Sequence, residues 1–278
     1  MKLGIVTDST ADLPPHLTEQ YEIQVVSPML ILDGKQYADG IGISREDFYT
    51  RLPSLQTPAT TAAPSIGDFL KPYQTLLDSG CDHILSIHVA GKLSGLLNNA
   101  RQAALEFPDK ITCVDSGLLS MGLGFQVLAA AENAELGLNA ALEAIESARR
   151  RLKVIAALDT MEYLKRSGRI PAVVANIGGL LSIKPVIELR DGEIKPMAVN
   201  RTAKQADEFV FAQLLEMGEM ERLAILHTNA EPRAKLLLHA MMEKARMSVP
   251  RDVLFVNVTA VIGTHLGPNC IGFAAVRK

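Results

Sequence analysis

Residues 83–101 read HILSIHVAGKLSGLLNNAR, and this stretch decides the fold class. It begins with a short apolar run, residues 83–88, typical of a buried strand, and ends in a helical pattern from Leu96 to Arg101. The connection contains Lys92-Leu93-Ser94-Gly95, which puts a hydroxyl where the strand passes into the helix. Backbone N–H groups at a helix start lack intrahelical partners and carry partial positive charge, so this junction suits a bound anion.

The alternation of apolar runs and helical patterns continues through the first half of the chain. Further strands are predicted at residues 3–7, 24–32 and 111–114. Ser65 and Asp68 have the spacing of a helix-capping pair, and the apolar residues after them recur at helical spacing. Strands that alternate with helices favour a mainly parallel sheet with helices on both faces. We therefore expect an N-terminal α/β domain over residues 1–160.

The second half of the chain predicts a different sheet. Asp191-Gly192 lies between two strand patterns, residues 184–190 and 193–199, and is a strong signal for a two-residue hairpin turn. Later segments alternate between helix and strand patterns, with helices expected near 202–217 and 232–247 and strands at 223–227, 254–258 and 271–276. This order predicts a C-terminal α/β domain with a mixed sheet over residues 161–278. It would close a ligand site against the first domain, which makes the whole an α/β protein of two domains.

Composition excludes several classes of function. The 278 residues carry a formal net charge of −3, which argues against nucleic acid as a partner, since binding it requires a basic surface. The sequence has no run of 18 apolar residues and no apolar signal region at its start, so we expect a cytoplasmic protein. Cys81, Cys113 and Cys270 lack metal or redox spacing, and we expect reduced thiols and no metal site.

Three segments are rich in small and hydroxyl residues: residues 57–65, the segment that holds Ser94, and residues 115–124. Each follows a predicted strand or begins a predicted helix, and ligands bind at that edge of open α/β sheets. Each segment taken alone is better explained by helix capping and turn formation. Three of them in one half of the chain favour a shared ligand site.

His265 is predicted to lie on a loop, because Gly263 precedes it and Gly267-Pro268 follows it. One interpretation pairs it with Ser94 as an acyl hydrolase. That reaction also needs an orienting acid and an oxyanion hole, and Leu93-Ser94-Gly95 is not the Gly-x-Ser-x-Gly elbow. The other interpretation is binding of a small anion, such as a carboxylate, by hydroxyls, an imidazole and helix-end amides. His88 and His227 are interpreted as ordinary strand-end residues.

Seven short motifs occur in one order along nearly the whole chain, and together they resemble those of the DegV family of bacterial fatty-acid-binding proteins, the FakB-type subunits of fatty acid kinase. The motifs are Ile5-Val6-Thr7-Asp8-Ser9-Thr10-Ala11-Asp12-Leu13, Tyr37-Ala38-Asp39-Gly40, Lys92-Leu93-Ser94-Gly95, Val114-Asp115-Ser116, Tyr163-Leu164-Lys165-Arg166-Ser167-Gly168-Arg169-Ile170, Leu181-Ser182-Ile183-Lys184-Pro185 and Thr264-His265-Leu266-Gly267-Pro268.

The resemblance implies a protein that encloses one long-chain fatty acid and needs no cofactor. The carboxyl would be held by Thr61, Ser94 and His265, and further contacts at the head would come from Thr60, Ala62, Gly95 and Ser116. A separate ATP-dependent kinase chain would phosphorylate the carboxyl to an acyl phosphate, so this chain would present the substrate without being the enzyme. Transient contact with a membrane surface is compatible with such a carrier.

Two basic residues match further positions of the family motifs. Arg169 and Arg201 would meet the kinase or the incoming phosphate, because a guanidinium group suits phosphate. Structural hydrogen bonding and helix-end charge explain both residues equally well.

The chain also departs from the family pattern near the expected head of the ligand. Ala62-Ala63, Val89-Ala90 and Leu96-Leu97 stand where polar residues are usual, and Asn269 replaces a glycine. The resemblance therefore implies fewer polar groups at the carboxyl, with water molecules in their place or a different lipid carboxylate as ligand.

Overall fold

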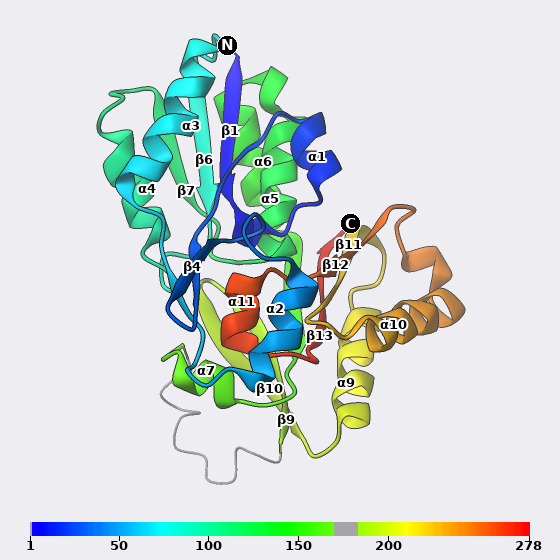
Figure 1. The fold of residues 1–278 in the computed structure, drawn as a ribbon. Coiled ribbons are helices and arrows are strands. Elements are labelled where there is room, and N and C mark those ends of the chain that lie inside the picture. Colours follow the sequence, from blue (N-terminus) through cyan, green and yellow to red (C-terminus); the bar gives the residue numbers. More distant parts are fainter. Residues whose placement is uncertain (1, 170–182) are drawn as a thin grey trace.

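The computed structural model describes residues 2–169 and 183–278. These residues form three β-sheets with helices packed on them (Figure 1). Three residues of the family motifs, Ile170, Leu181 and Ser182, lie outside the described residues. The fold is α/β, as predicted.

The first sheet is entirely parallel, which confirms the prediction for the first half of the chain. Its order is β2-β1-β6-β7. Helices α3 and α4 pack against one face of it, and α5 and α6 against the other (Figure 1). The bounds are β1 (Leu3–Asp8), β2 (Gln24–Val26), β6 (His83–His88), β7 (Ile111–Asp115), α1 (Pro15–Gln20), α3 (Ile66–Asp78), α4 (Leu96–Ala104), α5 (Met121–Glu132) and α6 (Leu138–Arg151).

The predicted single strand at residues 24–32 is wrong, because it is split between two sheets. Strand β2 joins the parallel sheet, whereas β3 (Met29–Leu32) pairs antiparallel with β4 (Lys35–Ala38) and β5 (Thr60–Ala62). Pro28 lies between the two strands and has no N–H to donate to a ladder, so the chain leaves the first sheet there. The small sheet packs beside α2 (Arg45–Arg51) and contains Thr61.

The third sheet is mixed, in the order β10-β9-β8-β13-β11-β12, as predicted for the second half. Only β11 and β12 pair in parallel, and the turn between β9 and β10 is the expected hairpin at Asp191-Gly192, where both residues have positive φ. Strand β8 joins this sheet although it precedes residue 160. The bounds are β8 (Leu152–Ala157), β9 (Lys184–Arg190), β10 (Glu193–Asn200), β11 (Met220–His227), β12 (Val253–Asn257), β13 (Ile271–Arg277), α9 (Ala203–Leu215) and α10 (Glu231–Lys244).

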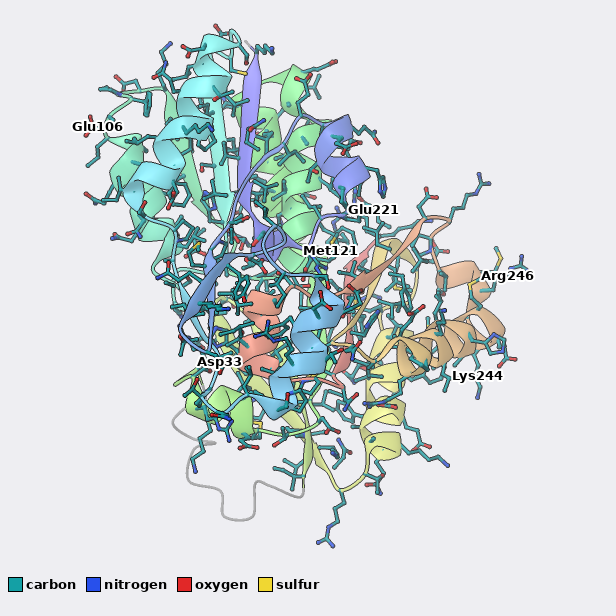
Figure 2. All side chains as sticks on the ribbon, viewed as in Figure 1. Asp33, Glu106, Met121, Glu221, Lys244 and Arg246 are labelled. Carbon is teal, nitrogen blue, oxygen red and sulfur yellow. The ribbon has the colours of Figure 1, made fainter. Side chains whose placement is uncertain are left out.

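Helix α5 lies between the parallel sheet and the mixed sheet, and it is buried on nearly all sides. Its sequence is apolar all round, as a helix enclosed by two layers requires. Gly122 allows the close approach to the mixed sheet, since a Cβ there would lie 2.6 Å from Cγ2 of Val154. Figure 2 shows Met121, the first residue of α5, at this junction in the middle of the molecule.

His265 lies on a short helix, α11 (Ala260–Leu266), and not on a loop as the sequence predicted. Gly263 does not break the helix because Tyr49 takes the place of a side chain there: a Cβ on Gly263 would lie 2.3 Å from the Tyr49 hydroxyl oxygen. The helix ends at Gly267, whose φ is 79°, and Pro268 prevents its continuation. Helix α11 packs beside α2 and α7 (Glu162–Arg166) (Figure 1).

Four short 3-10 turns complete the described elements; they are η1 (Ser9–Ala11), η2 (Leu52–Ser54), η3 (Ala134–Leu136) and η5 (Arg246–Ser248). Across residues 2–169 and 183–278, the search for a helix of sufficient length and hydropathy to span a bilayer found none.

Candidate functional site

A cavity of about 150 Å³ brings together residues from both halves of the chain. Thr61 from β5 and Ser94 at the start of α4 line it from the first half, and His265 on α11 lines it from the second. Its other walls are mostly apolar and include Val89, Leu119, Leu164, Ile194, Ile262 and Leu266. The structure therefore places the three residues predicted to hold a carboxyl around one cavity.

Thr61 and His265 are in direct contact. The Thr61 Oγ1 lies 3.2 Å from the His265 Nε2. Thr61 is held in place because β5 pairs with β3, where Leu30 is its partner and is fully buried. The pair thus joins the small sheet to α11 across 204 residues of sequence.

The His265 imidazole is neutral at pH 7. Burial lowers its pKa to about 4, and the positive charge of Arg169 adds to the effect. A neutral imidazole has one donor and one acceptor nitrogen. The Nδ1 atom is buried and has no hydrogen-bond partner within the described part of the chain. Most buried polar atoms have a partner, so this nitrogen is an exception.

The Ser94 hydroxyl proton has no acceptor among the described residues. Its Oγ accepts a hydrogen bond from the Leu96 N–H at 3.2 Å, so the oxygen takes part in the start of α4 while the O–H stays free to donate. The neighbouring segment is tied down by Asn99, whose amide donates to the Pro64 carbonyl at 2.8 Å. Gly95, the residue before α4, also lines the cavity.

The remaining candidate residues are divided between three places. Ala62 lines the same cavity as Thr61, and Thr60 lines a neighbouring one. Ser116 is fully buried, and its hydroxyl bonds to the backbone of Leu118, so it lines neither cavity. Arg201 is exposed after the end of β10 and also lies outside both cavities.

The neighbouring cavity has a volume of about 460 Å³ and polar walls that include Glu162, Arg166 and Ser167. It shares Thr61, Arg169 and His265 with the first cavity. These three side chains therefore stand at the boundary between a mostly apolar space and a polar one. An amphiphile with an anionic head would be oriented by such a boundary.

A separate, smaller apolar cavity of about 40 Å³ lies next to the first one, against the mixed sheet. Leu119, Ile262 and Leu266 line both spaces. Beyond them the walls are Val154, Leu226 and Val258, among others. This cavity lies between α11 and the mixed sheet, and none of Thr61, Arg169 and His265 lines it.

The geometry does not support Ser94 and His265 as a hydrolase pair. Among the hydrogen bonds of the described residues, none links the two side chains, and His265 has no orienting acid because its Nδ1 is unpartnered. Serine nucleophiles are activated by a hydrogen-bonded base that a third group orients.

A different serine–histidine–aspartate chain exists, which the sequence analysis did not predict. Asp8 Oδ2 lies 3.0 Å from His88 Nδ1, and His88 Nε2 lies 2.6 Å from Ser86 Oγ. Ser86 also bonds to Tyr73 at 2.8 Å. Asp8, Ser86, His88 and Tyr73 are all fully buried, so no substrate reaches them, and they tie β1 to β6. The available signal was the spacing of Ser86 and His88, which puts both on one face of a strand.

The departures from the family pattern fall largely on the cavity wall. Ala62, Ala63, Val89 and Leu96 all line the 150 Å³ cavity. Asn269 lies elsewhere, exposed and with a φ of 62° in the turn after α11. The wall of this cavity is therefore less polar at these four positions than the family pattern would make it.

Comparison with known protein families gives one consistent match. A family model described as an uncharacterised protein of the DegV family covers residues 2–278. A DegV domain-containing protein of Streptomyces coelicolor is 36% identical over 281 residues, which cover 97% of this chain and 96% of that protein. A second, from Deinococcus radiodurans, is 30% identical over 280 residues, 99% of this chain and 98% of that protein.

Solved structures show the same likeness. A DegV family protein from Thermus thermophilus, described for its fatty acid binding, has a TM-score of 0.91 and 34% identity, with both chains fully covered. DegV from Bacillus subtilis, described as a fatty acid binding protein, has a TM-score of 0.88 and 28% identity, again over the whole of both chains.

Proposed function

This chain belongs to the DegV family, and on that premise we propose that it binds one long-chain fatty acid, with the carboxyl held by Thr61, Ser94 and His265. Relatives of the same fold are described as fatty acid binding. Residues 161–278 would close the site against residues 1–160. The chain would carry and present the fatty acid and would not itself transfer a phosphoryl group.

The position of the Thr61–His265 contact gives the strongest support to the proposal. The Thr61–His265 contact lies at the boundary of an apolar and a polar cavity, beside the unpartnered buried Nδ1 of a neutral imidazole. A carboxylate at this boundary would accept hydrogen bonds from the Ser94 and Thr61 hydroxyls, while the Nε2–H of the neutral His265 ring donates to Thr61 Oγ1. The apolar side would receive the acyl chain, and the polar side would leave the carboxyl open to a reaction partner.

Most of the affinity would come from the acyl chain. Each buried CH₂ contributes roughly 0.8 kcal/mol, so the fourteen or so of a sixteen-carbon acid give on the order of 11 kcal/mol before the costs of binding. The apolar cavity, at about 150 Å³, is smaller than the roughly 300–1,000 Å³ of ordinary ligand sites. We therefore propose that Leu119, Ile262 and Leu266 move apart on binding and join it to the 40 Å³ cavity beyond them.

A separate ATP-dependent kinase would act on the presented carboxyl and form an acyl phosphate. The sequence contains no Gly-x-x-x-x-Gly-Lys-Ser/Thr loop that would hold ATP on this chain. Arg169 lines the polar cavity beside His265, where its guanidinium would meet the incoming phosphate or the kinase. Arg201 would contribute to the same encounter from the surface. Dependence on ATP favours the cytoplasm as the location, with brief membrane contact during loading.

A titration of the His265 ring by ¹H–¹⁵N NMR tests the proposal. Without ligand the ring should titrate with a pKa of about 4. Saturating palmitate should raise this pKa, because a carboxylate beside the ring favours the imidazolium form. A His265 titration that palmitate leaves unchanged, in a protein that also hydrolyses an acyl ester, would overturn the proposal in favour of the hydrolase.

A further inference from the structure

Thr259, the residue before α11, does not use its hydroxyl as helix-capping threonines do. At that position a threonine side chain commonly accepts a hydrogen bond from the first turn of its own helix, and Thr259 makes no such bond. Its hydroxyl instead donates to Oδ2 of Asp39, and its N–H donates to Oδ1 of Asp12 at 2.8 Å. All three residues are buried. Two carboxylates from the first half of the chain therefore meet at the residue just before α11.

The same segment is held by a second pair of side chains, one turn apart on α2. Arg45 donates to the carbonyl of Asn257, and the Tyr49 hydroxyl donates to the carbonyl of Val258 at 2.8 Å. The Tyr49 ring also packs against Gly263 inside α11. Residues 257, 258 and 259 are thus each bound by a side chain from the first half of the chain. We call Asp12, Asp39, Arg45 and Tyr49 the α11 clamp.

This arrangement is costly as a means of stabilising the fold. Burial raises the pKa of Asp12 to about 6, and only Arg45, 3.2 Å away, offers it a formal positive charge. The Oδ1 of Asp39 is buried without a partner within the described residues. Buried carboxylates seldom repay their desolvation in stability, and their best-attested use is to fix one arrangement among several. The clamp is therefore better explained as a means of fixing the position of α11 than as a source of stability.

We propose that the α11 clamp is a positioning device for His265, and that Thr259 is the residue through which it acts. Helix α11 has seven residues and would not be stable alone, so its direction is set where it is anchored. The clamp fixes the residue just before the helix, and His265 follows within two turns. That anchor therefore sets the orientation of the His265 ring relative to Thr61 and the cavity. The inference rests on the proposed function only where it concerns fatty acid affinity.

A set of three variants tests the proposal. Thr259→Val removes the hydroxyl that binds Asp39, and Thr259→Ser restores it. Thr7→Val is the matched control, because Thr7 is equally buried and its hydroxyl donates to the Ile87 carbonyl at 2.9 Å, away from α11. We would measure the melting temperature, the pKa and ¹⁵N shifts of the His265 ring without ligand, and the Kd for palmitate.

Both valine variants should melt at lower temperature than the wild type. Only Thr259→Val should move the His265 ring signals, raise its pKa from about 4 toward 6.5, and weaken palmitate binding by about tenfold, the equivalent of one charge-assisted hydrogen bond. Thr259→Ser should restore all of these values. The proposal is overturned if Thr259→Val leaves the ring signals and the Kd as in the wild type. If the wild type does not bind palmitate but Thr259→Val still shifts the His265 ring signals, the proposed function fails and the positioning role stands.

Discussion

In the proposed function, Thr61, Ser94 and His265 would meet the carboxylate as neutral groups. Hydroxyl and neutral imidazole groups can satisfy a carboxylate by hydrogen bonds without forming an ion pair. Burial keeps His265 in this state, since it lowers the pKa of the ring to about 4. A neutral site would leave the carboxylate with its charge uncompensated, which would suit the attack on a phosphoryl group that the proposed function requires.

Replacement of Ser94 by alanine should weaken palmitate binding by about tenfold or more, because a hydrogen bond to a charged group is worth roughly 1.5–3 kcal/mol. The variant also loses the bond from the Leu96 N–H, which should lower stability by about 1 kcal/mol. Isothermal titration and thermal melting measure the two effects.

Ser65→Ala is the matched control for the Ser94 variant. Ser65 caps α3 together with Asp68 and lines neither of the two cavities. Its loss should lower stability by a similar amount and leave palmitate binding as in the wild type. Equal affinity in Ser94→Ala and Ser65→Ala would remove Ser94 from the head of the site.

At the scale of elements, the sequence correctly predicted the helix start and the hairpin turn that short local motifs specify. The capping pair at Ser65 and Asp68 and the hairpin at Asp191-Gly192 both occur where expected. The strand predicted at residues 24–32 was wrong, because apolar content alone does not say to which sheet a residue belongs. The helix at His265 was missed for a related reason: Gly263 breaks helices in isolation, and only the packing of Tyr49, more than 200 residues earlier, makes it fit.

Gly263→Ala should destabilise α11 and weaken palmitate binding. The new Cβ would lie 2.3 Å from the Tyr49 hydroxyl oxygen and force the ring or the helix to move, at a cost of about 1–3 kcal/mol. Gly67→Ala on α3 provides the comparison, since its Cβ would meet nothing closer than 3.6 Å and alanine favours a helix by up to ~1 kcal/mol. Chemical denaturation of both variants checks this, and an unchanged midpoint for Gly263→Ala would contradict it.

At the scale of the molecule, the candidate site exists only because the two halves of the chain meet. Helix α5 packs between the parallel and mixed sheets, and the small sheet with α2 meets α11. Two of the seven motifs contain Ser94 and His265, which line the cavity, whereas Ser116 in a third does not line it and Thr61 lies in none of them. The motifs said nothing of the buried groups that hold these residues in place. Asp12 and Asp39 lie in two of these motifs, yet their contacts with Thr259 join residues more than 200 positions apart. The division of domains at residue 160 stays a prediction.

Two buried groups give the whole protein opposing pH dependences of stability. Folding lowers the pKa of His265 from 6.5 to about 4, so the unfolded chain holds the proton more tightly and stability falls as the pH drops from 6.5 toward 4. Folding raises the pKa of Asp12 from 3.8 to about 6, so stability rises as the pH drops from 6 toward 3.8. The two charged groups that face Asp12 act in opposite directions: Arg45 lowers its pKa and Asp39 raises it.

The two slopes should largely cancel in the wild type and appear in single variants. As the pH is lowered from 6 to 4, the free energy of unfolding of His265→Gln should rise and that of Asp12→Asn should fall, each by on the order of 2 kcal/mol. Urea unfolding at pH 4, 5, 6 and 7 measures the slopes independently of each variant's overall stability. Parallel curves for the two variants would contradict the pKa shifts of both groups.

Native mass spectrometry of the purified wild-type protein tests the central claim most directly. Gentle ionisation should show the 30.1 kDa chain with one additional mass, and organic extraction should release it as a single long-chain fatty acid. After removal of the lipid, added palmitate should restore the one-to-one complex. A protein that carries no lipid, takes up no palmitate after extraction and instead turns over an acyl ester would contradict the account.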